Sequence, residues 1–321
     1  MDLEEQTLHY YLKVLSVILL IFLFFSSFYI LNIFNKNLII KNNPLKISKG
    51  EKLENILKKN IINYSKLDIE IFKMYIKLDN FFKKDFIHHG EFFIKKETSI
   101  IDLKKIISKP SNILKKITIV EGWSQKKLNL ELSKYFKDFY PVPYSDIIAD
   151  TYLFQNGTNF NFFLEKLKMN KLKYFKTNNK NKLLQKFTEK EIMIIGSLLE
   201  KEGLDLEDKR KISSVIFNRL KKKMKLQIDA TVLYSITNGD YELDRKLLLS
   251  DLKFDHPYNT YIYKGLPPEP ISYVGKKTLD ILFENYNTDF LFYFFNNSLK
   301  RHIFSNNFAE HKKKLNEFRN K

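Results

Sequence analysis

Apolar and polar residues divide the chain into three stretches with different patterns. The segment VLSVILLIFLFFSSFYILNIF, between Lys13 and Lys36, carries no charge. From about residue 45 to 136, short strand-like runs alternate with amphipathic helices, and from residue 188 onward unusual polar residues lie among longer apolar helices. These patterns predict an α+β protein with an anchor, a small first region and a larger second domain.

The uncharged stretch predicts a helix that crosses a membrane once. A helix needs about 20 apolar residues to span the hydrocarbon core, and the run is too long for a signal peptide and lacks an A-x-A site after it. We assign residues 1–12 to a short cytoplasmic tail and residues 13–35 to an uncleaved anchor. Four lysines follow it, and lysine counting alone would place the body inside the cell: Lys36, Lys41, Lys46 and Lys49.

One small pattern recurs after the anchor. ISKGEKLENILKKN, FFIKKETSIIDLKKII and ITIVEGWSQKKLNLELSKYF each begin with a strand-like turn and continue at helical spacing. Ser99 and Ser124 stand where helix N-caps are expected, and a further amphipathic helix is predicted over residues 67–82. Because nothing in these units resembles an acid–base site, we expect binding or spacing to be their role.

Two glutamates close the helix that ends in SLLEKEG, residues 197–203. Thr188 and Glu191 predict a capping box at its start. Glu202 continues the apolar face formed by residues 195, 198 and 199, whereas Glu200 lies about 200° around the axis from that face. An apolar setting raises the pKa of a carboxyl group, as a general acid near neutral pH requires. The alternative is a helix that frays at Gly203 and leaves both glutamates in water.

Polar side chains downstream predict a ligand-facing row. A helix is expected over residues 207–224, with Asn218 set against its inward face. In LQIDATVLY, the residues Gln227, Asp229 and Thr231 alternate, so on an extended segment they would share one side. A turn held by Asp229 is the alternative.

Tyrosines gather in PYNTYIYKGLPPEPI, which contains Tyr258, Asn259 and Tyr261. Tyrosine rings offer flat faces to sugar rings and hydroxyls to their edges, although tyrosines are also ordinary packing residues. We therefore add these three residues to the candidate substrate-binding set.

Composition narrows the choice of partners. The formal charge is +18, but lysine is spread along the whole chain with Asn, Ile and Phe, which indicates a general bias and not a nucleic-acid-binding face. An anionic membrane or wall polymer fits the charge equally well. The absence of cysteine excludes disulfides and thiolate metal sites, and the six histidines show no HxxxH pairing, so no metal site is expected.

Several motifs follow one another across residues 190–312: LLEKEG, DKRKISSVIFNRL, MKLQIDATVLY, YNTYIYKGLPPEPI and HIFSNNFAEH. With GEFFI, IVEGWS and ADTYLF before them, they resemble the MltG/YceG family of membrane-anchored endolytic peptidoglycan transglycosylases. The chain departs from the family where residues 227–231 read Gln-Ile-Asp-Ala-Thr in place of Gln-Thr-Asp-Pro-Thr. Gly203 also replaces the common Ala or Thr, and ISYVG replaces the usual Pro-Gly near residue 274.

The resemblance implies LysM-like modules over residues 45–117 and a YceG-like α+β catalytic domain over residues 118–321. It implies cleavage of the β-1,4 bond between N-acetylmuramic acid and N-acetylglucosamine without water or cofactor. One carboxyl group protonates the leaving oxygen and then accepts the proton of the C6 hydroxyl that attacks C1, whereas ordinary glycosidases use two carboxyl groups. The family's glutamate corresponds to Glu202, and Glu200 is the second candidate.

The resemblance also implies the setting in which the protein works. Nascent peptidoglycan strands would be its substrate, the cytoplasmic membrane its attachment and peptidoglycan synthases its partners, while no nucleic acid is expected. Peptidoglycan lies outside the cytoplasmic membrane, so the catalytic body is expected on the outer side despite the lysine count. Two alternatives stay open, namely a hydrolase in which Glu202 pairs with Asp229 to add water, and a non-catalytic wall-binding scaffold.

Overall fold

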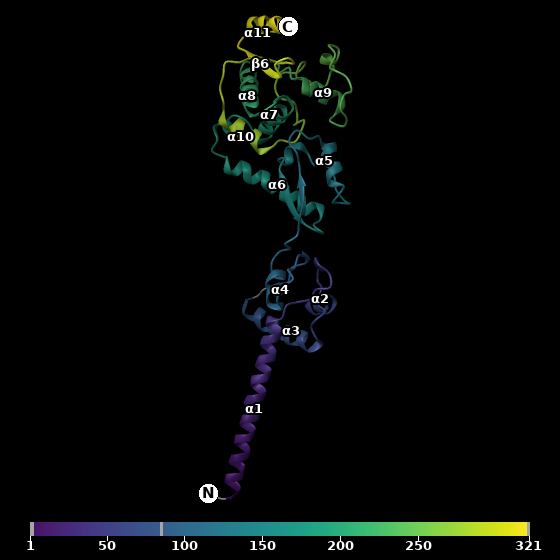
Figure 1. Ribbon diagram of the computed structural model, residues 1–321. Helices are drawn as coiled ribbons and strands as arrows, with labels where there is room; N and C mark the ends of the chain where they lie inside the picture. Colours follow the sequence, from purple (N-terminus) through teal and green to yellow (C-terminus); the bar gives the residue numbers. More distant parts are fainter. Residues whose placement is uncertain (1–2, 84–85, 320–321) are drawn as a thin grey trace. The chain divides into compact units, whose positions relative to one another are not determined.

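The computed structural model describes residues 3–83 and 86–319, which form two compact units (Figure 1). The first unit runs up to Lys115 and includes Phe154–Gly157, and the second contains residues 116–153 and 158–321. Both units combine helices with strands, which confirms the predicted α+β class.

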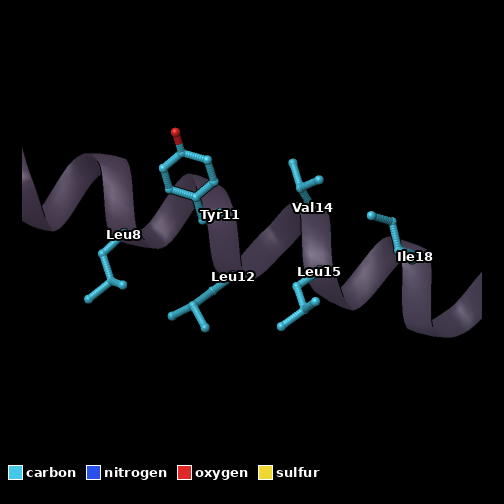
Figure 2. Close-up of a pocket in the computed structure, with 6 residues that line it drawn as sticks. All are labelled: Leu8, Tyr11, Leu12, Val14, Leu15 and Ile18. Atoms are coloured by element: carbon cyan, nitrogen blue, oxygen red, sulfur yellow. The ribbon is translucent and has the colours of Figure 1, made fainter.

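Helix α1 (Leu3–Asn35) contains the predicted anchor. Its segment Leu8–Asn35 is long and apolar enough to cross a membrane, and no other described helix passes that test. Figure 2 shows apolar side chains pointing outward around this helix, where six of them line a shallow depression: Leu8, Tyr11, Leu12, Val14, Leu15 and Ile18. Such a predominantly apolar, exposed helix suits single-pass anchoring.

The last turns of α1 pack against the rest of the first unit. Ile33 is buried in its core, and the backbone carbonyl of Ile33 accepts a hydrogen bond from the Tyr64 hydroxyl at 2.5 Å. The Tyr29 hydroxyl donates to Oδ1 of Asp68 at 2.6 Å. The end of the apolar helix is therefore covered by protein.

The first unit repeats the strand–turn–helix pattern expected from the sequence. Its elements are β1 (Leu45–Ile47), α2 (Leu53–Asn60), α3 (Lys66–Lys83), β2 (Gly90–Phe92) and α4 (Ile100–Ile107). The strands pair antiparallel, with Leu45 opposite Phe92. Ser99 caps α4 as expected, because its hydroxyl accepts from the amide of Asp102.

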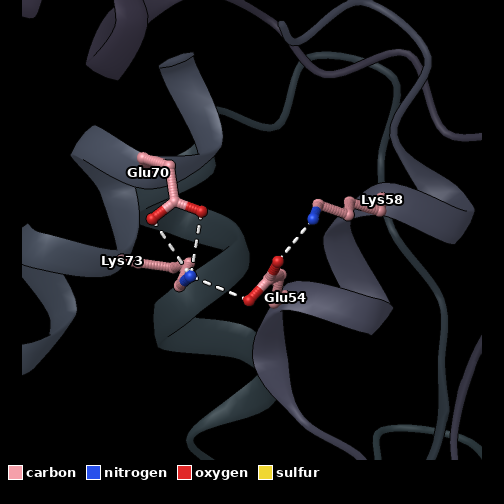
Figure 3. Close-up of polar contacts among 4 residues, drawn as sticks. All are labelled: Glu54, Lys58, Glu70 and Lys73. Carbon is pink, nitrogen blue, oxygen red and sulfur yellow. Dashed lines mark hydrogen bonds and ion pairs between the residues drawn. The ribbon is translucent and has the colours of Figure 1, made fainter. Parts of the chain in front are cut away.

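Charged side chains join α2 to α3 on the surface of this unit (Figure 3). Lys73 Nζ lies 2.8 Å from Glu54 and 2.9 Å from Glu70, and Lys58 also pairs with Glu54. The lysines Lys58 and Lys73 lower the pKa of Glu54 to about 2. Exposed pairs of this kind contribute little to stability, because water screens their charges.

The remaining elements belong wholly or mainly to the second unit. They are β3 (Leu114–Thr118), α5 (Gln125–Leu132), β4 (Thr151–Gln155), α6 (Phe160–Thr177), α7 (Glu189–Glu202), α8 (Leu206–Lys221), α9 (Asp229–Thr237), α10 (Lys276–Glu284), β5 (Phe292–Asn296), β6 (Arg301–Ser305) and α11 (Phe308–Arg319). Strand β3 pairs with β4, and β5 pairs antiparallel with β6.

Helix α7 lies at the centre of the second unit and packs against α8, α9 and α10. The predicted capping box is confirmed, since Thr188 and Glu191 bond reciprocally to each other's backbone amides. Residues 192–199 are all buried. At Gly196 an added β-carbon would come within 2.7 Å of Val274 Cγ1, so a glycine is needed for this close approach. The core thus fixes the helix whose end carries the two glutamates.

Candidate functional site

Glu202 is the last residue of α7, and its carboxyl group is held from two sides. Oε1 accepts a hydrogen bond from the amide of Ala230 at 3.3 Å, and Oε2 accepts one from the Tyr293 hydroxyl at 3.2 Å. Ala230 lies in the first turn of α9 and Tyr293 lies on β5. Three elements distant in sequence therefore converge on one partly buried carboxyl group.

The surroundings of Glu202 favour its neutral form. Burial is the largest cause and raises its pKa, and the negative charge of Asp229 acts in the same direction. The hydrogen bonds from Ala230 and Tyr293 and the nearby His302 oppose this effect without cancelling it, so the pKa lies above that of an ordinary glutamate. A carboxyl group in this state can donate a proton near neutral pH.

Glu200 occupies a different environment from the one expected. Its side chain is only 3% exposed, and Oε2 forms an ion pair with Lys209 Nζ at 2.5 Å. Oε1 accepts from the amide of Gly275 at 3.0 Å, and Lys209 also donates to Thr278 at 2.9 Å. Glu200 lies on a different side of α7 from Glu202, and this side is buried as well, because Lys209 of α8 and Gly275 before α10 cover it. Glu200 links these helices.

The end of α7 is ordered by the same contacts. The amide of Gly203 bonds to the carbonyl of Leu199 at 2.9 Å. An added β-carbon at Gly203 would lie 2.3 Å from Lys209 Cγ, so this departure from the family pattern is coupled to the position of the lysine that pairs with Glu200. The alternative of a frayed helix end with two solvated glutamates is wrong.

The expected polar row does not form. Asp229 begins α9, whereas Gln227 precedes that helix with a positive φ of 51°, so the alternating residues are not on one extended segment. Thr231 is fully buried and its hydroxyl donates to the carbonyl of Ile228 at 2.6 Å. The backbone amides of Gln227 and Ile228 bond to Thr260. This pairing ends after two residues, and a helix follows because Thr231 and Val232 enter the core.

Two of the predicted binding residues, Asn218 and Asn259, use their side chains to hydrogen-bond backbone carbonyls. The Asn259 side chain is fully buried and its amide donates to the carbonyls of Leu252 and Phe254 at 3.2 and 2.8 Å. The Asn218 amide donates to the carbonyls of Thr288 and Phe290 at 2.7 and 2.9 Å. Both residues therefore order loops around the site.

Of the other predicted residues, Asp229 and Tyr261 interact electrostatically with Glu202. The Tyr261 hydroxyl donates to Asp229 at 2.6 Å, and the charge of Asp229 reaches Glu202. Gln227 accepts from Arg219 at 3.3 Å. Tyr258 packs against Tyr234, with ring centroids 4.8 Å apart.

Sequence reasoning missed the group of side chains behind Glu202. His302 lies 2.7 Å from Asp208, and both side chains are nearly buried, at 6% and 10% exposed. The His302 ring meets that of Tyr293 edge-on at 5.3 Å. The quoted motif HIFSNNFAEH contains His302, which was the one available signal. In residues 3–83 and 86–319 no group of three histidine or acidic side chains is arranged to hold a metal ion.

Comparisons with known proteins agree with this architecture. An endolytic murein transglycosylase of Bacillus subtilis (strain 168) is 39% identical over 140 residues, which are 44% of this chain and 38% of that protein. One from Streptococcus pneumoniae serotype 2 (strain D39) is 29% identical over 135 residues, 40% of this chain and 24% of that protein. The matched region thus spans well under half of these curated relatives.

A solved structure and a family model match a larger part of the chain than these relatives do. The crystal structure of a yceG-like protein from Listeria monocytogenes has a TM-score of 0.51 at 24% identity and covers 84% of this chain and 97% of that chain, which supports a shared fold. The model of the YceG-like family matches residues 45–317. Because this match includes most of the chain, the protein belongs to the YceG-like family.

Proposed function

We propose that this protein is an endolytic lytic transglycosylase of peptidoglycan. It would cleave the β-1,4 bond between N-acetylmuramic acid and N-acetylglucosamine in nascent strands, leave a 1,6-anhydromuramic end and so limit strand elongation. The family and the names of the relatives support this reaction class. The observation that carries the assignment is Glu202, a carboxyl group with a raised pKa held by two hydrogen-bond donors.

Glu202 can serve both steps of such a reaction. In its neutral form, which burial favours, it donates a proton to the leaving glycosidic oxygen. The carboxylate formed in that step accepts hydrogen bonds from the Ala230 amide and the Tyr293 hydroxyl. It then takes the proton of the C6 hydroxyl as that oxygen attacks C1, so no water molecule is consumed.

Substrate positioning is assigned to the residues beside Glu202. We assign this role to Asp229, Tyr261 and Gln227, because their carboxylate, hydroxyl and amide groups can form hydrogen bonds with the hydroxyl groups of a sugar. Thr231, Asn218 and Asn259 support the surrounding backbone, and Tyr258 supplies an aromatic face. We propose that glycan strands run past the first three residues.

Asp229 also favours a second candidate function. Its negative charge raises the pKa of Glu202, so the two carboxyl groups lie near each other. A hydrolase would use this pair, with Glu202 as acid and Asp229 activating water. The two candidates differ in the sugar end that they leave.

The proposed setting is the cytoplasmic membrane, with α1 as its single span and the rest of the chain on the outer side. The residues 45–117 would act as LysM-like modules that bind glycan or space the catalytic domain from the bilayer, and peptidoglycan synthases would be the partners. Protease added to intact spheroplasts should digest the body. Full protection in sealed cells would instead support an inward orientation, as the lysine count suggests.

Incubation of the detergent-solubilised protein with glycan strands tests the reaction. Mass analysis should find shortened strands that end in 1,6-anhydromuramic acid. Reducing ends would support the hydrolase, and strands that are bound but not shortened would support the scaffold. Glu202→Gln is the matched control, because it retains the shape of the side chain.

A further inference from the structure

Helix α3 has apolar residues on two opposite faces. One face enters the core of the first unit with the buried residues Ile69, Phe72 and Ile76. The opposite face is exposed to solvent and holds three large apolar side chains, which are 60, 61 and 59% exposed: Leu67, Met74 and Leu78. Their spacing of seven and four residues places them in one stripe along the helix.

The stripe has the character of a binding surface. Core packing accounts for the buried face of α3, whereas Leu67, Met74 and Leu78 stay exposed. Glu70, which pairs with Lys73, borders these side chains between Leu67 and Met74. Exposed apolar side chains gathered on one helix face mark contacts with membranes or other proteins. The exposed Lys66 and Lys77 accompany the stripe on the same helix, and interfacial helices carry lysine beside their apolar face in this way.

The position of α3 relative to α1 indicates that the membrane contacts this stripe. The sequence places the anchor at residues 13–35, but Ile33 is buried in the core of the first unit, so the part of α1 inside a bilayer would end before that residue. Within the apolar segment Leu8–Asn35, the stretch from Leu8 to Phe28 is about 31 Å long at 1.5 Å per residue, close to the thickness of about 30 Å of a hydrocarbon core. Tyr29 follows directly and bonds to Asp68 in the first turn of α3 at 2.6 Å. The start of α3 is thus tied to the point where α1 would leave the bilayer.

The middle of α3 also contacts the end of α1. Phe34, which is five residues or about 7.5 Å further along α1 than Tyr29, packs against Phe72 and Tyr75, with ring centroids 6.4 and 4.9 Å apart. Figure 1 shows α3 crossing the end of α1 on the side of the unit from which the length of α1 extends. The core face points into the unit, so the stripe points toward the bilayer.

We infer that α3 is an interfacial helix that lies on the membrane spanned by α1. The stripe of Leu67, Met74 and Leu78 enters the boundary between headgroups and acyl chains, and Lys66 and Lys77 contact anionic headgroups. This inference rests on the proposed anchoring by α1 and is independent of the reaction. With α1, it gives the first unit two attachments to one bilayer, so the unit does not pivot freely about its anchor.

Site-directed fluorescence in vesicles tests this inference. The chain contains no cysteine, so single cysteines can be placed at Met74 or Leu78 of the full-length protein and labelled with a polarity-sensitive dye. In vesicles of phosphatidylethanolamine and phosphatidylglycerol, lipids carrying a doxyl quencher should remove fluorescence at both positions, and aqueous iodide should have little effect. Leu249, which is 82% exposed in the second unit, is the matched control and should respond only to iodide.

A label at Leu20 in α1 separates the two proposals. Lipid quenching at Leu20 but iodide quenching at Met74 and Leu78 overturns the interfacial helix and leaves the anchor intact. Loss of lipid quenching at Leu20 overturns both. A third outcome is that the labels are protected from both quenchers and that the unlabelled Leu78→Cys protein forms a disulfide between two copies. This result would show that a second copy covers the stripe, and it would also overturn the inference.

Discussion

The Tyr293 hydroxyl lies 3.2 Å from Oε2 of Glu202, although the two residues are 91 positions apart. Burial raises the pKa of Tyr293 well above its usual value, so this hydroxyl remains protonated throughout the neutral range. It is therefore a permanent donor to Glu202, and it favours the carboxylate that forms once the proton has been given away.

Tyr293→Phe should weaken catalysis and move its pH dependence. A hydrogen bond to a charged group contributes about 1.5–3 kcal/mol, so we expect kcat to fall by about 10- to 100-fold. The lost bond lowered the pKa of Glu202, so that pKa should rise in the variant. Because the first step needs protonated Glu202, the alkaline limb of kcat/KM should shift to higher pH. If the alkaline limb does not move, the Tyr293 hydroxyl does not influence the pKa of the catalytic acid.

Glu202→Gln should stabilise the fold in a pH-dependent way. The pKa of Glu202 is raised in the folded state, so its stability contribution is complete below the unfolded pKa of about 4.3 and is lost as pH rises through the folded value. The variant should therefore gain Tm relative to the wild type near pH 7 and much less near pH 4. If the variant and the wild type differ in Tm by the same amount at both pH values, the buried Glu202 carboxylate does not destabilise the folded state.

Glu200→Gln should have the opposite effect on stability. It leaves Lys209, whose side chain is 13% exposed, without its ionic partner. Removing one member of a buried pair costs about 3–5 kcal/mol, and the remaining amide hydrogen bonds should reduce the loss to about 1–3 kcal/mol. Thermal unfolding near pH 7 checks this.

The double variant Glu200→Gln/Lys209→Met provides the control for this ion pair. It removes both charges and should recover part of the lost Tm, because no unpaired ammonium group stays buried. If the single variant is as stable as the wild type, the contact between Glu200 and Lys209 does not hold the helices together.

Local signals in the sequence predicted where helices start in both units. Ser99, Ser124 and the pair Thr188 and Glu191 cap helices as expected, because capping depends on residues within one turn. The apolar spacing that leads to Glu202 likewise predicted a carboxyl group at the edge of the core. These features need no knowledge of distant partners.

Contacts between distant segments were beyond such reasoning. Glu200 is buried because Lys209 and Gly275 come to it, and Gly275 is 75 residues away. Residues 227–231 alternate like a strand, but pairing with Thr260 stops after two residues and α9 begins. Tyr293 looks like one aromatic residue among several until β5 places its hydroxyl at Glu202.

The most direct test compares Glu202→Gln and Glu200→Gln on one preparation of glycan strands. The yield of 1,6-anhydromuramic ends is measured at a temperature where both variants are folded. General acid–base catalysis contributes about 10²–10⁴-fold, so Glu202→Gln should form almost no product, while Glu200→Gln should retain most of the wild-type rate. An inactive Glu200→Gln beside an active Glu202→Gln would contradict the assignment of the acid.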